Sequence, residues 1–197
     1  MAAFDPNGVG LKGALFGLPH TIKEAKIVVL PMPWDVTVSY RSGTSKAPAQ
    51  ILDASTQIDY FLLDKAHAWK TAVAMAEVPE VWQSLGENLR LKAVEYINWL
   101  EEGSPLEQRD TMLLHLDEVN DECTQLMAYV EQESSYYHER GQKTILLGGD
   151  HSTPLGHIKA CLRTKSVESV GILQIDAHAD LRKAYEGFKY SHASIMW

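Results

Sequence analysis

Short apolar runs that end at glycine, proline or polar residues recur along this chain, and they predict buried strands. Residues 26–30 (Lys-Ile-Val-Val-Leu) end at Pro-Met-Pro, residues 144–147 (Thr-Ile-Leu-Leu) end at two glycines, and residues 170–175 (Val-Gly-Ile-Leu-Gln-Ile) lead into polar positions. Runs of this length, rich in Val, Ile and Leu, are typical of strands covered on both faces. Residues 73–78 alternate like a strand, whereas residues 58–63 favour neither strand nor helix.

Helical spacing lies between these runs. Apolar residues fall at intervals of three and four in four segments, namely residues 48–55, 87–101, 117–140 and 154–163. Pro48 and Pro154 suit the first turn of a helix, and Ser152 or Thr153 is placed to cap the last of them. A strand, a helix and a second strand over residues 144–175 predict a βαβ unit with parallel strands. The chain is therefore predicted to be an α/β protein.

The run at residues 170–175 leads into three ligand-type side chains at spacing two: Asp176, His178 and Asp180. If the backbone stays extended there, the three share one face. Carboxylate oxygens and neutral imidazole nitrogens suit Mn²⁺, Zn²⁺, Fe²⁺ or Co²⁺. His151 follows the other strand of the βαβ unit, so the parallel topology brings it to the same edge of the sheet. A purely structural interpretation is disfavoured, because clustering so many buried polar groups costs several kcal/mol without compensation.

Other polar residues have simpler interpretations. Asp150 is interpreted as a turn or cap residue, and His157 as a packing residue on the helix that follows. Three further histidines, His67, His115 and His138, lack carboxylate neighbours at ligand spacing and are interpreted as surface or packing residues. The long polar loop of residues 34–47 follows the first strand. It is either part of a site at the strand's carboxyl end or a plain connection.

Composition narrows the class of protein. The chain has 197 residues and a net charge of −8, which argues against binding to nucleic acid or to an anionic membrane. With 45% hydrophobic residues it is expected to form a single domain over residues 1–197. No signal peptide or membrane span is recognisable. Cys123 and Cys161 are isolated in sequence and are expected to be reduced, buried thiols of a cytoplasmic protein.

Three short motifs in the last third resemble signatures of the ureohydrolase family, whose members include arginase, agmatinase and formimidoylglutamase. They are residues 148–152 (Gly-Gly-Asp-His-Ser), 176–180 (Asp-Ala-His-Ala-Asp) and 191–194 (Ser-His-Ala-Ser), and residues 33–55 are similar to the family's first strand, loop and helix. The resemblance implies a three-layer α/β/α fold with a central, mainly parallel sheet. It also implies an amidinohydrolase that releases urea from a small guanidino substrate.

The resemblance further implies a site with two Mn²⁺ ions. His151, Asp176 and Asp180 would hold the first ion and His178 the second, with Asp176 bridging them. A water ionised between the two ions would attack the guanidinium carbon. His192 matches a histidine near the mouth of the site and is expected to relay protons to the leaving amine. The alternative is that His192 only lines the entrance.

The sequence also departs from the family pattern, because no Asp-x-Asp occurs in it. The resemblance places that signature on a later strand, so we expect an amino-terminal portion of a ureohydrolase, with the fold incomplete on its C-terminal side. Two functions stay open. One is agmatinase-like hydrolysis, with arginine or formimidoylglutamate (a formimino compound) as alternative substrates. The other is a catalytically incomplete fragment or interaction module with a partial metal site. A homo-oligomer is expected in either case.

Overall fold

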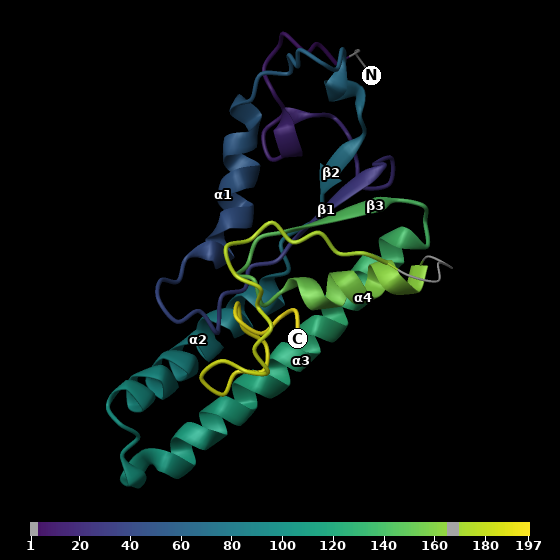
Figure 1. Ribbon diagram of the computed structural model, residues 1–197. Helices are drawn as coiled ribbons and strands as arrows, with labels where there is room; N and C mark the ends of the chain where they lie inside the picture. Colours follow the sequence, from purple (N-terminus) through teal and green to yellow (C-terminus); the bar gives the residue numbers. More distant parts are fainter. Residues whose placement is uncertain (1–3, 165–169) are drawn as a thin grey trace.

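The computed structural model describes residues 4–164 and 170–197 and contains a parallel sheet in the order β2–β1–β3 (Figure 1). The strands are β1 (Ile27–Pro31), β2 (Val73–Met75) and β3 (Lys143–Leu147). The central strand is β1, where Ile27 is paired with Val73 on one side and with Lys143 on the other. Parallel strands joined through helical segments confirm the predicted α/β class.

In the described residues, four α-helices surround and extend the sheet: α1 (Ala47–Ala54), α2 (Glu80–Glu101), α3 (Arg109–His138) and α4 (Pro154–Thr164). The α2 and α3 helices form a long antiparallel hairpin that reaches away from the sheet (Figure 1). Both begin earlier than their spacing predicted. Val81, Leu113 and Leu114 lie in the extra turns and are exposed, so apolar side chains there interrupt the periodic pattern.

Among the described residues, two clusters of buried side chains form the core. The smaller one lies between the sheet and α3, where Val28, Leu30 and Ala74 belong to one cluster with Tyr137. The larger one fills the hairpin and takes in Trp34 and other residues that follow β1. Trp34, Val36 and Thr37 are fully buried. The first part of the polar loop at residues 34–47 is therefore a core segment, and only its tip is exposed.

The strand predicted at residues 170–175 does not form, so the βαβ unit lacks its second strand. Leu173 and Ile175 are 86% and 92% exposed. In Figure 1 this segment runs in the same direction as β3, without ladder hydrogen bonds to it. The physical reason is the lack of cover: within the described residues β3 pairs with β1 alone, and no layer of side chains packs on the apolar positions of residues 170–175.

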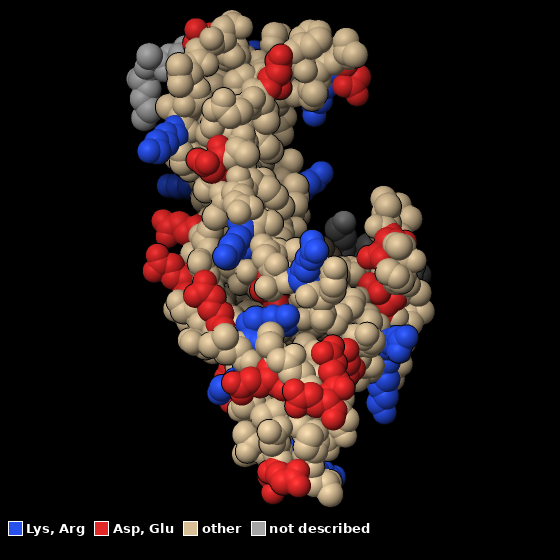
Figure 2. Space-filling view, turned by 90° about the vertical axis from the view of Figure 1, so that its left-hand side faces the viewer, with Lys and Arg blue, Asp and Glu red and all other residues tan. Residues whose placement is uncertain are grey.

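The surface carries mixed charge on the face shown in Figure 2, and acidic side chains gather toward the lower end, where the turn between α2 and α3 lies. Glu101, Glu102, Glu107 and Asp110 are the exposed acidic residues at that turn. No helix in residues 4–164 and 170–197 is both long and apolar enough to cross a membrane. The assignment of residues 1–197 to one domain stays a prediction.

Candidate metal centre

The turn from β3 into α4 sets the position of the site, and two glycines allow it. Gly148 and Gly149 both have positive φ, +83° and +73°. A Cβ on Gly149 would lie 2.7 Å from the Trp34 carbonyl oxygen and 2.7 Å from Thr153 Cγ2. Both the backbone conformation and the close approach require glycine here. The backbone N–H of Asp150 then donates to the same Trp34 carbonyl at 2.8 Å, which ties the turn to the segment after β1.

Asp150 stabilises this turn through its buried side chain, in agreement with its interpretation as a turn residue. One carboxylate oxygen accepts hydrogen bonds from the Ser152 backbone N–H, at 2.9 Å, and from the Ser152 hydroxyl. The other oxygen is buried and has no hydrogen-bond partner in the described part of the chain. Burial raises the pKa of Asp150, and the hydrogen bonds from Ser152 oppose that rise. Asp150 therefore fixes the turn that carries His151, the next residue in the sequence.

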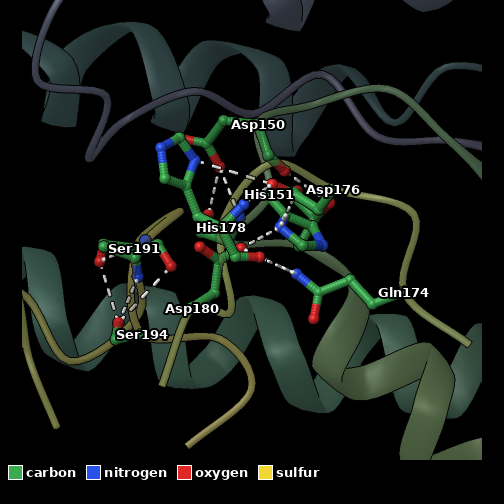
Figure 3. Close-up of polar contacts among 11 residues, drawn as sticks. Asp150, His151, Gln174, Asp176, His178, Asp180, Ser191 and Ser194 are labelled. Carbon is green, nitrogen blue, oxygen red and sulfur yellow. Dashed lines mark hydrogen bonds and ion pairs between the residues drawn. The ribbon is translucent and has the colours of Figure 1, made fainter. Parts of the chain in front are cut away.

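His151 lies at the centre of the predicted constellation (Figure 3). Its Nδ1 is 2.6 Å from Asp180 Oδ2 and 3.4 Å from Asp176 Oδ2. The Asp180 side chain is 4% exposed, and that of Asp176 is 28% exposed. Residues 29 positions apart in sequence thus meet, as predicted. They do so at the carboxyl end of β3, even though the second strand of the βαβ unit is absent.

Of the four predicted metal ligands, His178 is the one whose side chain points toward solvent. Its side chain is 82% exposed, and its Nδ1 lies 3.7 Å from Asp176 Oδ1. The prediction that Asp176, His178 and Asp180 share one face of an extended segment is therefore wrong. The His178 backbone N–H donates to Asp176 Oδ1 at 2.8 Å, a local bond that bends the chain and lowers the pKa of Asp176. Asp180 then takes a positive φ of +53°, which turns its side chain inward.

Gln174 belongs to the site and was not among the predicted residues. Its amide Nε2 donates to Asp180 Oδ2 at 3.3 Å and to the His178 carbonyl at 3.0 Å (Figure 3). These two bonds hold the Asp180 carboxylate and the bend around His178 in one arrangement. A signal was present in the sequence, because Gln174 continues the spacing of two that relates the three ligand-type residues.

His192 lies on a separate, tightly bonded turn. Ser191 and Ser194 fix that turn through their hydroxyl groups, 2.9 Å apart, and Thr37 binds the preceding Tyr190 carbonyl at 2.9 Å. The imidazole packs edge-on against Tyr185, with 5.5 Å between ring centroids. Its Nδ1 is buried and accepts or donates no hydrogen bond within the described residues. The His192 imidazole lowers the pKa of Asp150, though less than burial raises it, so it lies within electrostatic reach of the site.

The loop after β1 is fastened by two residues that sequence reasoning did not single out. Asp35 is buried, and its Oδ2 accepts backbone hydrogen bonds from Gly43 at 2.6 Å and Ser45 at 3.3 Å. From α2, Arg90 donates to the carbonyls of Val36 and Val38. An Asp that closes its own loop is common in turns, and Arg90 is an ordinary helix residue in the sequence, so neither position carried a distinctive signal.

The donor set is suitable for a divalent cation. His151, Asp176 and Asp180 each offer one ligand atom, and these atoms all lie within 4.8 Å of one another. Two carboxylates and one imidazole match the ligand preference of Mn²⁺, Zn²⁺ and related ions. The Asp180 carboxylate is nearly inaccessible to water, and a buried anion is stabilised by a cation or by charge-assisted hydrogen bonds. In the described residues this is the one group of three ligand-type residues that meets this distance.

Fold and site together define an α/β protein with a carboxylate–histidine cluster at the carboxyl edge of a parallel sheet. The chain belongs to the arginase family, whose model matches residues 25–197. This confirms the ureohydrolase resemblance and the arginase-like fold class.

Individual relatives agree with this assignment. The chain is 27% identical over 184 residues to N(1)-aminopropylagmatine ureohydrolase of Thermus thermophilus, covering 93% of this chain and 50% of that protein. It is 25% identical over 185 residues to agmatinase of Bacillus anthracis, covering 92% and 50%. The crystal structure of agmatine ureohydrolase of Thermoplasma volcanium superposes with a TM-score of 0.61 at 22% identity, covering 93% of this chain and 48% of that one. The chain thus spans about half the length of these relatives.

Proposed function

We propose that this chain provides metal ligands for the active site of an amidinohydrolase. Such an enzyme hydrolyses a guanidino C–N bond and releases urea. The observation that carries the proposal is the convergence of His151, Asp176 and Asp180 within 4.8 Å in a chain of the arginase family. A bound divalent ion would supply a Lewis acid that lowers the pKa of water and provides a nucleophile at neutral pH. Mn²⁺ is the ion we propose.

The ligand roles follow from the orientation of Asp176. Its Oδ2 faces His151 and its Oδ1 faces His178, at 3.4 Å and 3.7 Å from the respective Nδ1 atoms. His151, Asp176 and Asp180 would hold one ion, and His178 together with Asp176 would hold a second. Gln174 holds the Asp180 carboxylate in place by a hydrogen bond. His178 has to turn inward from solvent to take part, so we expect the first position to bind more tightly.

His192 is the proposed proton-transfer residue. Its Nδ1 is buried and has no hydrogen-bond partner in the described residues, and such an uncompensated polar atom is typical of a functional position. The bonded turn of Ser191 and Ser194 restricts its motion. Imidazole is a common general acid and base in catalysis, so we assign to His192 the protonation of the leaving amine.

An agmatinase-like substrate is favoured by the names of the relatives. Agmatine and N(1)-aminopropylagmatine, which those names contain, both carry a guanidinium group on a linear amine. Arginine and formimidoylglutamate are the alternative substrates. Location in the cytoplasm and assembly into a homo-oligomer stay predictions.

A second candidate is a catalytically incomplete module that binds one ion. The exposed His178 side chain favours it, since only three ligand atoms are gathered in the described residues. The two candidates differ in turnover, so activity separates them.

The deciding experiment measures product release by the 197-residue chain supplied with Mn²⁺. Urea is assayed with agmatine, N(1)-aminopropylagmatine and arginine, and formamide with formimidoylglutamate. The hydrolase is supported if the unaltered chain turns over agmatine and His192→Ala lowers that turnover about 100-fold. The Mn²⁺ content should be the same in both proteins. Bound Mn²⁺ without any product supports the one-ion module. If His192→Ala loses Mn²⁺ to the same degree as it loses turnover, His192 is a ligand.

A further inference from the structure

A histidine–cysteine pair lies outside the metal centre, where α4 packs against α3. His157 and Cys161 are one helical turn apart on α4, and His157 Nε2 lies 3.9 Å from Cys161 Sγ. On its other side, His157 Nδ1 lies 3.0 Å from the hydroxyl of Ser134, a fully buried residue of α3. The two helices approach closely here, as Gly156 shows: a Cβ at this position would lie only 2.3 Å from the Met127 carbonyl oxygen. The three side chains are therefore held in a fixed order: hydroxyl, imidazole, thiol.

This order sets the protonation of the imidazole. When Nδ1–H donates to the Ser134 hydroxyl, the lone pair of Nε2 faces the Cys161 thiol. Burial first, and the neighbouring His138 second, lower the pKa of His157, so the resting ring is neutral at pH 7. Because burial disfavours a lasting imidazolium, the ring holds the thiol proton only while the thiol reacts. A thiol becomes nucleophilic when it loses its proton, and a neighbouring imidazole is a common acceptor.

The two cysteines differ in access. Cys161 is partly exposed, whereas Cys123 is 1% exposed in the core of the hairpin. Burial raises the pKa of the Cys123 thiol, which leaves it protonated and unreactive. Its carboxylate neighbour Asp150 acts in the same direction. The sequence-based expectation of two buried thiols therefore holds for Cys123 and fails for Cys161.

We propose that Cys161 is a reactive thiol and a site of covalent modification by peroxides, with His157 as its proton acceptor and Ser134 as the residue that positions His157. The thiol gives its proton to His157 Nε2, and the thiolate sulfur attacks one peroxide oxygen. The S–O bond forms as the O–O bond breaks, and the leaving hydroxide takes the proton from His157 to become water. The sulfur is oxidised by two electrons to a sulfenic acid, and hydrogen peroxide is reduced.

The test treats the folded chain with hydrogen peroxide at pH 7, traps sulfenic acid with dimedone and quantifies each cysteine by peptide mass spectrometry. Iodoacetamide alkylation gives a second rate for the same thiols. We expect Cys161 to be modified while Cys123 stays unmodified. His157→Gln should slow modification of Cys161 about tenfold. Ser134→Ala should slow it as well, and Ser134→Thr, which keeps the hydroxyl, should not.

Cys123 serves as the internal control for folding. If a variant unfolds, Cys123 becomes modified too, and the comparison then rests on whichever of His157→Gln and Ser134→Ala keeps Cys123 protected. The proposal is overturned if Cys161 reacts no faster than free cysteine. It is equally overturned if the modification rate of Cys161 is unchanged in a His157→Gln or Ser134→Ala variant that keeps Cys123 protected.

Discussion

Asp180 combines burial, charge and an unusual backbone conformation in one residue. Its side chain is 4% exposed, and its carboxylate contacts His151 and Gln174. A positive φ of +53° costs a non-glycine residue roughly 1–2 kcal/mol. Such strain is retained where the surroundings hold it and function uses it. The strained residue in the midst of the ligand cluster therefore supports a functional role for the cluster.

A pH dependence is expected from His157. Its pKa is lowered from the ordinary value of 6.5, chiefly by burial, so the unfolded state binds a proton before the folded state does. The free energy of unfolding should be unaffected above about pH 6.5, fall as the pH drops below that value, and level off below the folded-state pKa. Chemical denaturation between pH 7.5 and 5, compared with His157→Gln, measures this.

The His157→Gln variant should show the shallower loss of stability over that range, because Gln does not titrate. Carboxylates that titrate at lower pH are shared by both proteins and cancel in the difference. Parallel curves for the two proteins would mean that His157 is accessible to solvent and titrates normally.

At the scale of elements, most of the sheet and helices could be predicted because their signals are local. Pro48 and Pro154 marked helix starts, and the two glycines after β3 marked the tight turn. Two features could not be predicted. The segment at residues 170–175 has the composition of a strand, but strand formation depends on a partner and a covering layer. The outward turn of His178 comes from a hydrogen bond between neighbouring residues, which spacing alone does not reveal.

The turn from β3 into α4 gives an element-scale prediction. Gly149→Ala forces a side chain into positive φ and into the 2.7 Å contacts with Trp34 and Thr153. We expect a loss of about 2–5 kcal/mol in the free energy of unfolding. Urea unfolding monitored by circular dichroism measures it.

Gly141→Ala is the matched control. Gly141 lies in the turn after α3 and has a nearly equal φ of +75°, but a Cβ there meets no atom within 4 Å. Its substitution should lower the free energy of unfolding by only about 1–2 kcal/mol, which is the cost of positive φ for alanine. Equal losses for the two variants would mean that the turn relaxes and that the close approach to Trp34 is not required.

At the scale of the whole molecule, the described residues contain an unpaired sheet edge and an uncovered apolar segment. In the described part of the chain β3 has one ladder partner, and Leu173 and Ile175 are almost fully exposed. Edges and apolar patches of this kind promote association. The expected homo-oligomer has a physical basis in this surface.

Replacing Leu173 and Ile175 together by serine should reduce self-association and leave stability nearly unchanged. Exposed positions change the free energy of unfolding by about 0.5 kcal/mol or less. Light scattering measures the mass in solution, and thermal unfolding measures stability. The matched control replaces Val9 and Leu11, which are also exposed but lie far along the chain from this segment.

Two results would contradict this prediction. A fall of many degrees in the unfolding midpoint would show that residues 170–175 pack as a strand in solution. Equal association of the double variant, its control and the unaltered chain would show that another surface mediates assembly.

The central claim is that His151, Asp176 and Asp180 form a cation site, and Mn²⁺ binding measured by isothermal titration calorimetry tests it most directly. We predict that the unaltered chain binds Mn²⁺ and that Asp180→Asn weakens binding at least about tenfold. His178→Ala should weaken it less, and Asp53→Asn, at an exposed position on α1, should have no effect. Equal Mn²⁺ affinity in the unaltered chain and in folded Asp180→Asn would contradict the account.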